Sequence, residues 1–111
     1  MIKFHELFRN ASYEGIAKMI GKSSAQSVLF HAKFEVYSNE PGKLHDCLID
    51  MLGPLGTVLL EKSVIREMFE QMNEPMTHES YLSGDSFEFV KSVEYIRKLY
   101  ARKKITQQSL V

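Results

Sequence analysis

The chain has 111 residues, which is enough for one compact domain and too short for two of ordinary size. Apolar residues make up 44% and charged residues 25%, a balance typical of a globular protein with a packed core. The formal net charge is zero, which argues against a general electrostatic attraction to nucleic acid or to an anionic membrane. The single cysteine, Cys47, excludes an intramolecular disulfide and fits a reducing compartment.

The N-terminal sequence MIKFHELFRN lacks the apolar run of a signal peptide. No stretch of the sequence reaches the roughly 20 apolar residues that are needed to span a bilayer. We therefore expect a cytoplasmic protein without membrane contact. We expect residues 1–106 to form a single helical domain and residues 107–111 to form a frayed C-terminal tail.

Apolar residues of the first segment recur at three- and four-residue steps, the spacing of one helix face. They are Phe4, Leu7, Phe8, Ala11, Gly15, Met19 and Ile20. Gly21 suits the left-handed residue that closes a helix. Ser23 and Gln26 then have the spacing of a capping box, which predicts a second helix starting at Ser23 within the segment 23–37. The β-branched and aromatic end of that segment leaves a short strand open, and we favour the helix.

The longest apolar series covers residues 44–72 in steps of four and three, and Pro41 suits the first position of its helix. Pro54 interrupts this series, because proline lacks an amide donor and clashes with the carbonyl four residues back. One helix is therefore predicted to end at Gly53 and the next to begin at Pro54, with a shared core-facing register. A glycine inside a helix lowers stability by roughly 0.8–1.0 kcal/mol relative to alanine. We therefore predict that Gly56 lies in close contact with another helix, where a larger side chain would not fit.

A polar, turn-rich linker follows, in which Asp85 and Glu88 have the spacing of a second capping box. It opens a final helix whose apolar face contains Phe89, Val90, Val93, Ile96 and Tyr100. The sequence thus predicts an all-α fold, a compact bundle of four to five helices with a helix break at Gly53-Pro54.

Two patterns invite a search for phosphate or metal binding. The sequence GKSS at residues 21–24 resembles part of a phosphate-binding loop, but that loop needs a glycine at position 16, which is Ile16, and a preceding strand. The histidines form no close ligand pair, and a single cysteine excludes the familiar zinc clusters; they are His5, His31, His45 and His78. We expect His31 to be a buried polar residue beside Phe30, with a proton-sensitive switch as the alternative.

Acidic residues recur on two predicted helix faces. Asp46 and Asp50 lie four residues apart beside His45, and such a pair can bind a cation or divide acid and base roles. A solvated helix face is the simpler interpretation, and it also fits the charged run that contains Glu61, Lys62, Arg66, Glu67 and Glu70. We therefore predict no catalytic residues, no metal site and no cofactor, and a protein that is not an enzyme.

The C-terminal sequence RKLYARKK concentrates positive charge in the last helix, with Arg97, Lys98, Arg102, Lys103 and Lys104. Cations near a helix C-terminus interact favourably with the helix dipole, by about 0.3–1 kcal/mol each. The alternative is a contact surface for an acidic partner protein or for a nucleic-acid backbone. Against DNA stand the zero net charge and the lack of a clear helix-turn-helix unit.

Roughly residues 3–72 resemble the Nitrosopumilus output domain family, a group of small helical archaeal signalling modules. The resemblance lies in a helix that ends at Ile20-Gly21, an aromatic-rich helix around Val28-Leu29-Phe30-His31, and the break Leu52-Gly53-Pro54-Leu55-Gly56. It implies an output or adaptor role in archaeal sensor-kinase or response-regulator systems, and it implies no catalytic residues. The chain departs from the pattern at Pro54, which replaces a helix-compatible residue, and we expect any input signal to come from another protein.

Apolar residues exceed what a single packed face requires, with seven Phe, five Tyr and six Met. Small helical domains bury such surplus in oligomers or partner sites. The leading hypothesis is therefore a non-enzymatic interaction module in signal transduction, expected to bind a protein partner or itself as a homodimer. Its candidate partner surface consists of Leu59, Ile65, Phe69, Phe89 and Tyr100. The alternatives are a transcription-linked nucleic-acid binder that uses the basic last helix, and a small-molecule sensor with an inter-helical pocket polarised by His31 or His45.

Overall fold

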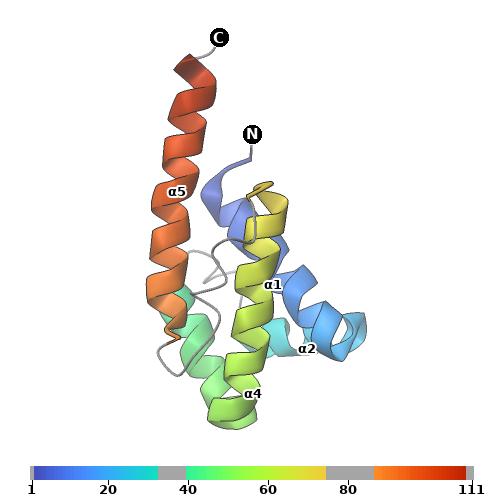
Figure 1. Cartoon of the computed structure of the whole chain (residues 1–111). Helices are drawn as coiled ribbons and strands as arrows, with labels where there is room; N and C mark the ends of the chain where they lie inside the picture. The colour runs from blue at the N-terminus through green and yellow to red at the C-terminus, as the bar shows by residue number, and fades with distance from the viewer. Residues whose placement is uncertain (1, 33–39, 75–86, 110–111) are drawn as a thin grey trace.

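The computed structural model describes residues 2–32, 40–74 and 87–109, with side chains up to residue 103 (Figure 1). These ranges contain four helices and no strand: α1 (Phe4–Ile20), α2 (Lys22–His31), α4 (Pro41–Gln71) and α5 (Phe89–Ser109). The prediction of an all-α fold is confirmed. The molecule measures 45 × 30 × 22 Å, and α4 packs against both α1 and α5 while α2 packs against α1.

One predicted boundary differs from the structure, and three predicted features fall outside the described residues. Helix α5 begins at Phe89 and continues to Ser109, so it includes part of the segment 107–111 that was expected as a tail. The proposed cap at Asp85, the histidine His78 and the segment 33–39 lie outside the described residues.

Gly21 joins α1 to α2 directly. Its backbone has φ 91° and ψ 160°, and its N–H donates to the Ala17 carbonyl oxygen at 2.8 Å, which closes α1. The Gly21 carbonyl then accepts the Ala25 N–H at 3.0 Å, which starts α2. The prediction of a capping box at Ser23 is therefore wrong: Gly21 is the N-cap, and the helix already includes Lys22 and Ser23.

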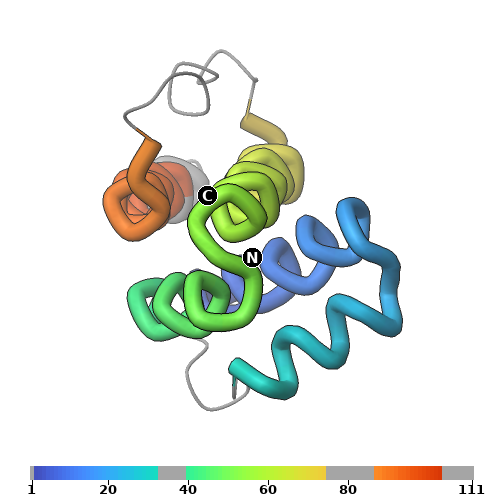
Figure 2. Tube along the Cα trace, turned by 90° about the horizontal axis from the view of Figure 1, so that it is seen from below, coloured from blue at the N-terminus to red at the C-terminus, as the bar shows by residue number. Residues whose placement is uncertain are grey.

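Helix α4 changes direction in its middle. It extends from Pro41 to Gln71 as one element, and Gly53 within it has the non-helical angles φ 75° and ψ 174°. Figure 2 shows the two parts, here called the first arm (residues 41–52) and the second arm (residues 54–71), diverging from this point. The described ranges contain four helices, the lower of the four to five predicted. The direction of α4 changes at Gly53, and we call Gly53 and Pro54 the joint.

Replacing Gly53 with alanine should destabilise the protein by about 1–3 kcal/mol, because its φ and ψ lie in a region that is essentially restricted to glycine. The added Cβ would meet no atom within 4 Å, so the cost would arise in the backbone alone. Urea denaturation measures the change. Gly42→Ala is the matched control, since Gly42 also lies in α4 with open space and no left-handed φ. Equal stability of the two variants would contradict the prediction.

Helices α1 and α4 cross at close range at Gly15. A Cβ on Gly15 would lie 2.8 Å from the Cα and N atoms of Val64 and 2.9 Å from the carbonyl carbon of Ser63. The Ser63 hydroxyl donates to the Gly15 carbonyl oxygen at 2.7 Å. The prediction that Gly56 makes the close contact is wrong: among the described residues, its added Cβ would meet only Leu52 Cβ of the same helix, at 3.2 Å.

The core lies where α1, the two arms of α4 and α5 meet. Phe8 of α1 packs against Phe89 of α5 with ring centroids 6.1 Å apart, and Phe4 packs against Tyr100 at 5.9 Å. Helix α5 presents Phe89, Val93 and Ile96 to this core, as its apolar spacing predicts. The prediction that Val90 belongs to the same face is wrong, because Val90 is exposed by 41%. No helix in the described ranges is both long and apolar enough to cross a membrane.

Candidate functional site

The residues predicted as a partner surface separate into two groups. Ile65, Phe69, Phe89 and Tyr100 are exposed by 7% or less and belong to the core. Only Leu59, exposed by 57%, lies at the surface. The surplus of apolar side chains is therefore used mainly inside the chain, where it joins α1, α4 and α5.

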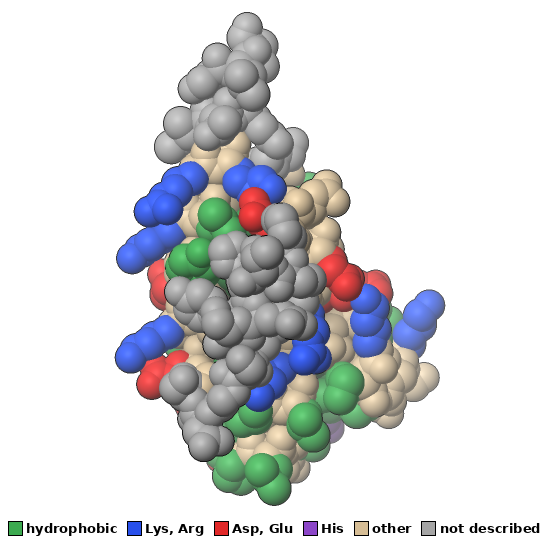
Figure 3. Space-filling view, in the orientation of Figure 1, with side chains coloured by type: hydrophobic (Ala, Val, Ile, Leu, Met, Phe, Trp, Pro, Cys, Tyr) green, Lys and Arg blue, Asp and Glu red, His purple; other side chains and the backbone are tan. Residues whose placement is uncertain are grey.

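A different group of apolar side chains is exposed around the joint of α4. Met51 and Leu52 come from the end of the first arm, and Leu55 and Leu59 come from the start of the second. Their exposed fractions are 39%, 42%, 84% and 57%, in chain order. Figure 3 shows apolar side chains gathered at the lower end of the molecule, where Figure 1 places the change of direction in α4. We call these four residues the joint surface.

The joint surface exists because the two arms bury their inner faces. Leu48 of the first arm and Leu60 of the second are exposed by 0% and 3%. A helix that bends presents its opposite side at the outer corner, where its own chain cannot cover it. Phe30 of α2 is also exposed, by 82%.

A buried carboxylate spans the inside of the same joint. Glu61 of the second arm is exposed by 1%, and its Oε2 lies 2.6 Å from Nδ1 of His45 in the first arm. Burial raises the pKa of Glu61, and the hydrogen bond and charge of His45 oppose this increase. The prediction that Glu61 lies on a solvated face is wrong. Asp46 and Asp50, in contrast, are exposed, as a solvated face requires.

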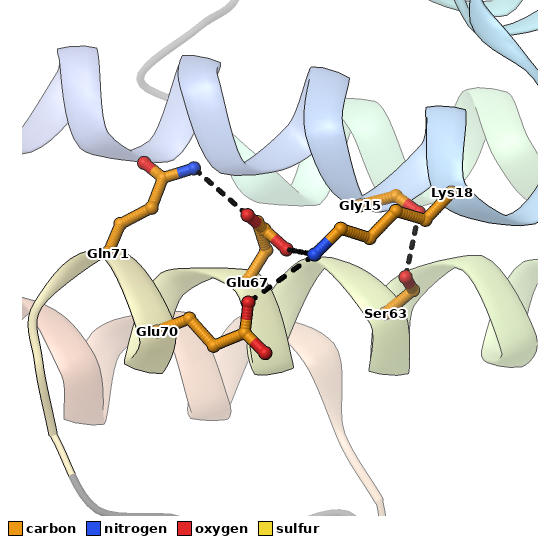
Figure 4. A network of polar contacts seen from close by, with 6 residues as sticks. All are labelled: Gly15, Lys18, Ser63, Glu67, Glu70 and Gln71. Carbon is orange, nitrogen blue, oxygen red and sulfur yellow. Dashed lines mark hydrogen bonds and ion pairs between the residues drawn. The ribbon is translucent and has the colours of Figure 1, made fainter.

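Glu67 is the second carboxylate that the sequence assigned to a solvated face and the structure buries, with 8% exposed. Lys18 of α1 donates to Glu67 Oε2 at 2.6 Å and to Glu70 Oε2 at 3.3 Å (Figure 4). These hydrogen bonds, with that to Glu67 first, raise the pKa of Lys18. The Gln71 amide donates to Glu67 Oε1 at 3.5 Å within α4. The Lys18 contacts therefore join α1 to a network on the second arm of α4.

The basic residues of α5 are engaged to different extents. Lys103 pairs with Glu74 at 2.8 Å and donates to the Met72 carbonyl oxygen at 2.8 Å, which ties α5 to the end of α4. Arg97 lies 3.6 Å from Glu94 and stacks 4.9 Å from the Phe4 ring centroid. Lys98 and Arg102 are exposed, and the side chain of Lys104 lies outside the described residues. Among the cations of α5 described here, Lys98 and Arg102 thus form an exposed pair one helix turn apart.

A cleft of about 430 Å³ lies where the N-terminal segment meets the ends of α4 and α5. It is lined by Ile2, Leu7, Gln71, Met72, Asn73, Tyr100 and Lys103. Neither His31 nor His45 lines this cleft, although the sensor hypothesis uses them to polarise a pocket. The prediction of a buried His31 is also wrong, because it is exposed at the end of α2 beside the Phe30 ring.

Within the described residues, no three His, Cys, Asp or Glu side chains come together in a way that could hold a metal ion. The joint combines an exposed apolar corner with a part-buried contact between His45 and Glu61. Comparison of the chain with protein-family models, with curated proteins and with solved structures finds no match.

Proposed function

We propose that the protein is a non-enzymatic interaction module that forms a homodimer through the joint surface and serves as an output element in intracellular signal transduction. The observation that supports this proposal is the exposure of Leu55 and Leu59, one helix turn apart, beside Met51 and Leu52. Clusters of exposed apolar residues commonly mark partner sites. In a two-fold dimer the same patch lies on both subunits, so a single apolar surface is sufficient.

The energetics favour Leu55 as the central contact. It is exposed by 84%, and complete burial of a leucine side chain stabilises a complex by about 1.5–3 kcal/mol. The joint also presents no charged residue among positions 51–59, so a second copy would meet no charge that must be desolvated there. Docking of two joint surfaces therefore combines apolar burial with a low desolvation cost.

The double variant Leu55→Glu with Leu59→Glu should be monomeric under conditions in which the wild type is dimeric, because two carboxylates per subunit would have to be buried in the contact. Both side chains are exposed, so the fold should be retained, which circular dichroism checks. Sedimentation equilibrium at micromolar concentration measures the association. A wild type that remains monomeric, or a variant that dimerises equally well, contradicts the proposal.

Ile2→Glu is the matched control for surface charge. Ile2 is a large apolar residue exposed by 43%, and it lies near the N-terminus, which Figure 1 shows at the opposite end of the molecule from the joint. Dimerisation of this variant should equal that of the wild type. Loss of dimerisation in the control would indicate a non-specific effect of added charge.

Nucleic-acid binding by α5 is the alternative function, and it rests on the exposed pair Lys98 and Arg102. Each phosphate contact made by a cation contributes to the salt dependence of binding, so two charges predict weak and shallow dependence. Arg97 and Lys103 already have carboxylate neighbours in Glu94 and Glu74. We therefore favour the protein–protein function.

A further inference from the structure

We infer that the cleft where the N-terminal segment meets the ends of α4 and α5 binds a small neutral molecule that has an apolar body and a carbonyl group. The volume of this cleft, about 430 Å³, lies within the usual range of ligand pockets, which is about 300–1,000 Å³. The N-terminus and the end of α4 lie at the opposite end of the molecule from the joint (Figure 1). A ligand in the cleft would not touch the joint surface, so the site does not depend on the proposed dimer.

The apolar side chains that line the cleft come from several elements. Leu7 of α1 is exposed by 2%, while Met72 at the C-cap of α4 and Tyr100 of α5 are each exposed by 7%. Ile2 of the N-terminal segment completes this apolar lining and is exposed by 43%. Ligand pockets usually combine such a lining with a few polar groups that fix the orientation of the ligand. The apolar body of the ligand would pack against these four side chains.

Two side-chain contacts of α5 hold the walls of the cleft in position without a ligand. The Tyr100 hydroxyl donates to the Ile2 carbonyl oxygen, which ties the N-terminal segment to α5. Nζ of Lys103 donates to the Met72 carbonyl oxygen at 2.8 Å, which ties the end of α4 to α5. Because these walls are already connected, binding of a ligand does not have to order them, and this preorganisation favours affinity.

Asn73 is a polar residue of the lining whose backbone is fixed by the way α4 ends. Its φ of 56° is left-handed. Its N–H donates to the Glu70 carbonyl oxygen at 3.0 Å, and the N–H of Glu74 donates to the Phe69 carbonyl oxygen at 3.0 Å. These two bonds form a Schellman motif, the usual closure of a helix by a left-handed residue. The carboxamide of Asn73 is therefore attached to a rigid part of the wall of the cleft.

The polar groups indicate the chemistry of the ligand. Lys103 alone is charged among the residues that line the cleft, and the Glu74 carboxylate lies 2.8 Å from its ammonium group. Because this pair is neutral as a whole, the cleft favours a neutral ligand over an anion. An ammonium group has three donors, and the contacts of Lys103 with Glu74 and Met72 use two of them. The third donor and the amide of Asn73 suit an acceptor such as a carbonyl oxygen.

The test uses the fluorescent dye Prodan, a neutral naphthalene with one ketone group, whose emission moves to shorter wavelength in apolar surroundings. We expect the wild type to bind it saturably. Asn73→Gly removes the carboxamide and keeps the left-handed backbone accessible, so the fold should be retained, which circular dichroism checks. Its dissociation constant for Prodan should rise about three- to tenfold, the effect of losing one hydrogen bond. Ile2→Trp, at a half-exposed position, should fill the cleft and raise the constant by about tenfold or more.

Leu55→Glu with Leu59→Glu is the matched control, because an apolar dye can also bind to the joint surface. We expect this double variant to bind Prodan as the wild type does. In amide NMR spectra of the nitrogen-labelled wild type, the dye should also shift the side-chain signals of Asn73, which the Asn73→Gly spectrum identifies by their loss. The inference is overturned if the wild type binds no dye saturably, if both cleft variants bind it as the wild type does, or if the double variant alone loses binding.

Discussion

Replacing Gly15 with alanine should destabilise the protein by about 2 kcal/mol or more. The new Cβ would lie 2.8 Å from backbone atoms of Val64, which cannot move aside as a side chain can, so α1 and α4 must separate. Overpacking typically costs about 1–3 kcal/mol and occasionally more, and the better helix propensity of alanine returns at most about 1 kcal/mol. Separation also weakens the hydrogen bond from the Ser63 hydroxyl to the Gly15 carbonyl oxygen.

Thermal unfolding gives the most direct readout of Gly15→Ala. For a domain of about this size, each kcal/mol corresponds to a shift in Tm of roughly 4–8 °C. Gly42→Ala serves again as the control, because its Cβ would meet nothing within 4 Å. We expect Tm to fall for Gly15→Ala and to hold or rise for Gly42→Ala. A Tm for Gly15→Ala equal to or above that of the wild type would show that the two helices do not cross at this glycine.

Replacing Phe69 with alanine should cost about 3–5 kcal/mol, the usual range for truncating a fully buried aromatic residue. Phe69 is exposed by 1% and lies in the core formed by α1, α4 and α5. The sequence predicted that Phe69 lies on a partner surface, so the experiment distinguishes a position in the core from a position on that surface. Urea denaturation of a dilute, monomeric sample measures the free energy of unfolding.

Leu55→Ala is the control for Phe69→Ala. It lies on the same arm of α4 but is exposed by 84%, so its stability as a monomer should change little. We expect Leu55→Ala to weaken dimerisation and Phe69→Ala to lower the stability of the monomer itself. The opposite result, with a stable Phe69→Ala monomer that no longer associates, would return Phe69 to the partner surface.

The helices can be predicted from the sequence because the local spacing of apolar residues and the positions of glycine and proline specify them. The three- and four-residue apolar steps predict α1 and α5, and Pro41 and Gly21 lie at a helix start and a helix end, as expected. Four of the five residues predicted for the apolar face of α5 are buried, and the fifth, Val90, is exposed by 41%. These features depend on residues within one or two turns of each other, which a sequence displays directly.

The orientation of the second arm could not be read in this way. The predicted series of steps of four and three over residues 44–72, continued through the joint, has Leu55 and Lys62 at core-facing positions. Gly53 between the two arms is non-helical, and in the second arm Leu60, Glu61 and Val64 are buried while Leu55 is exposed. A positive φ at one glycine is a backbone conformation that cannot be predicted from the pattern of apolar side chains.

What the sequence determined by itself is therefore the helical class, the end of α1 at Gly21 and the start of α4 at Pro41. Tertiary structure alone decided that Gly15 rather than Gly56 lies at the close crossing, since both are glycines on apolar stripes and only the opposing helix distinguishes them. It also decided that Glu61 and Glu67 are buried. Their partners are distant in sequence: His45 contacts Glu61 and Lys18 contacts Glu67, 16 and 49 residues away along the chain. A buried carboxyl group needs such a partner, and only the fold brings it near.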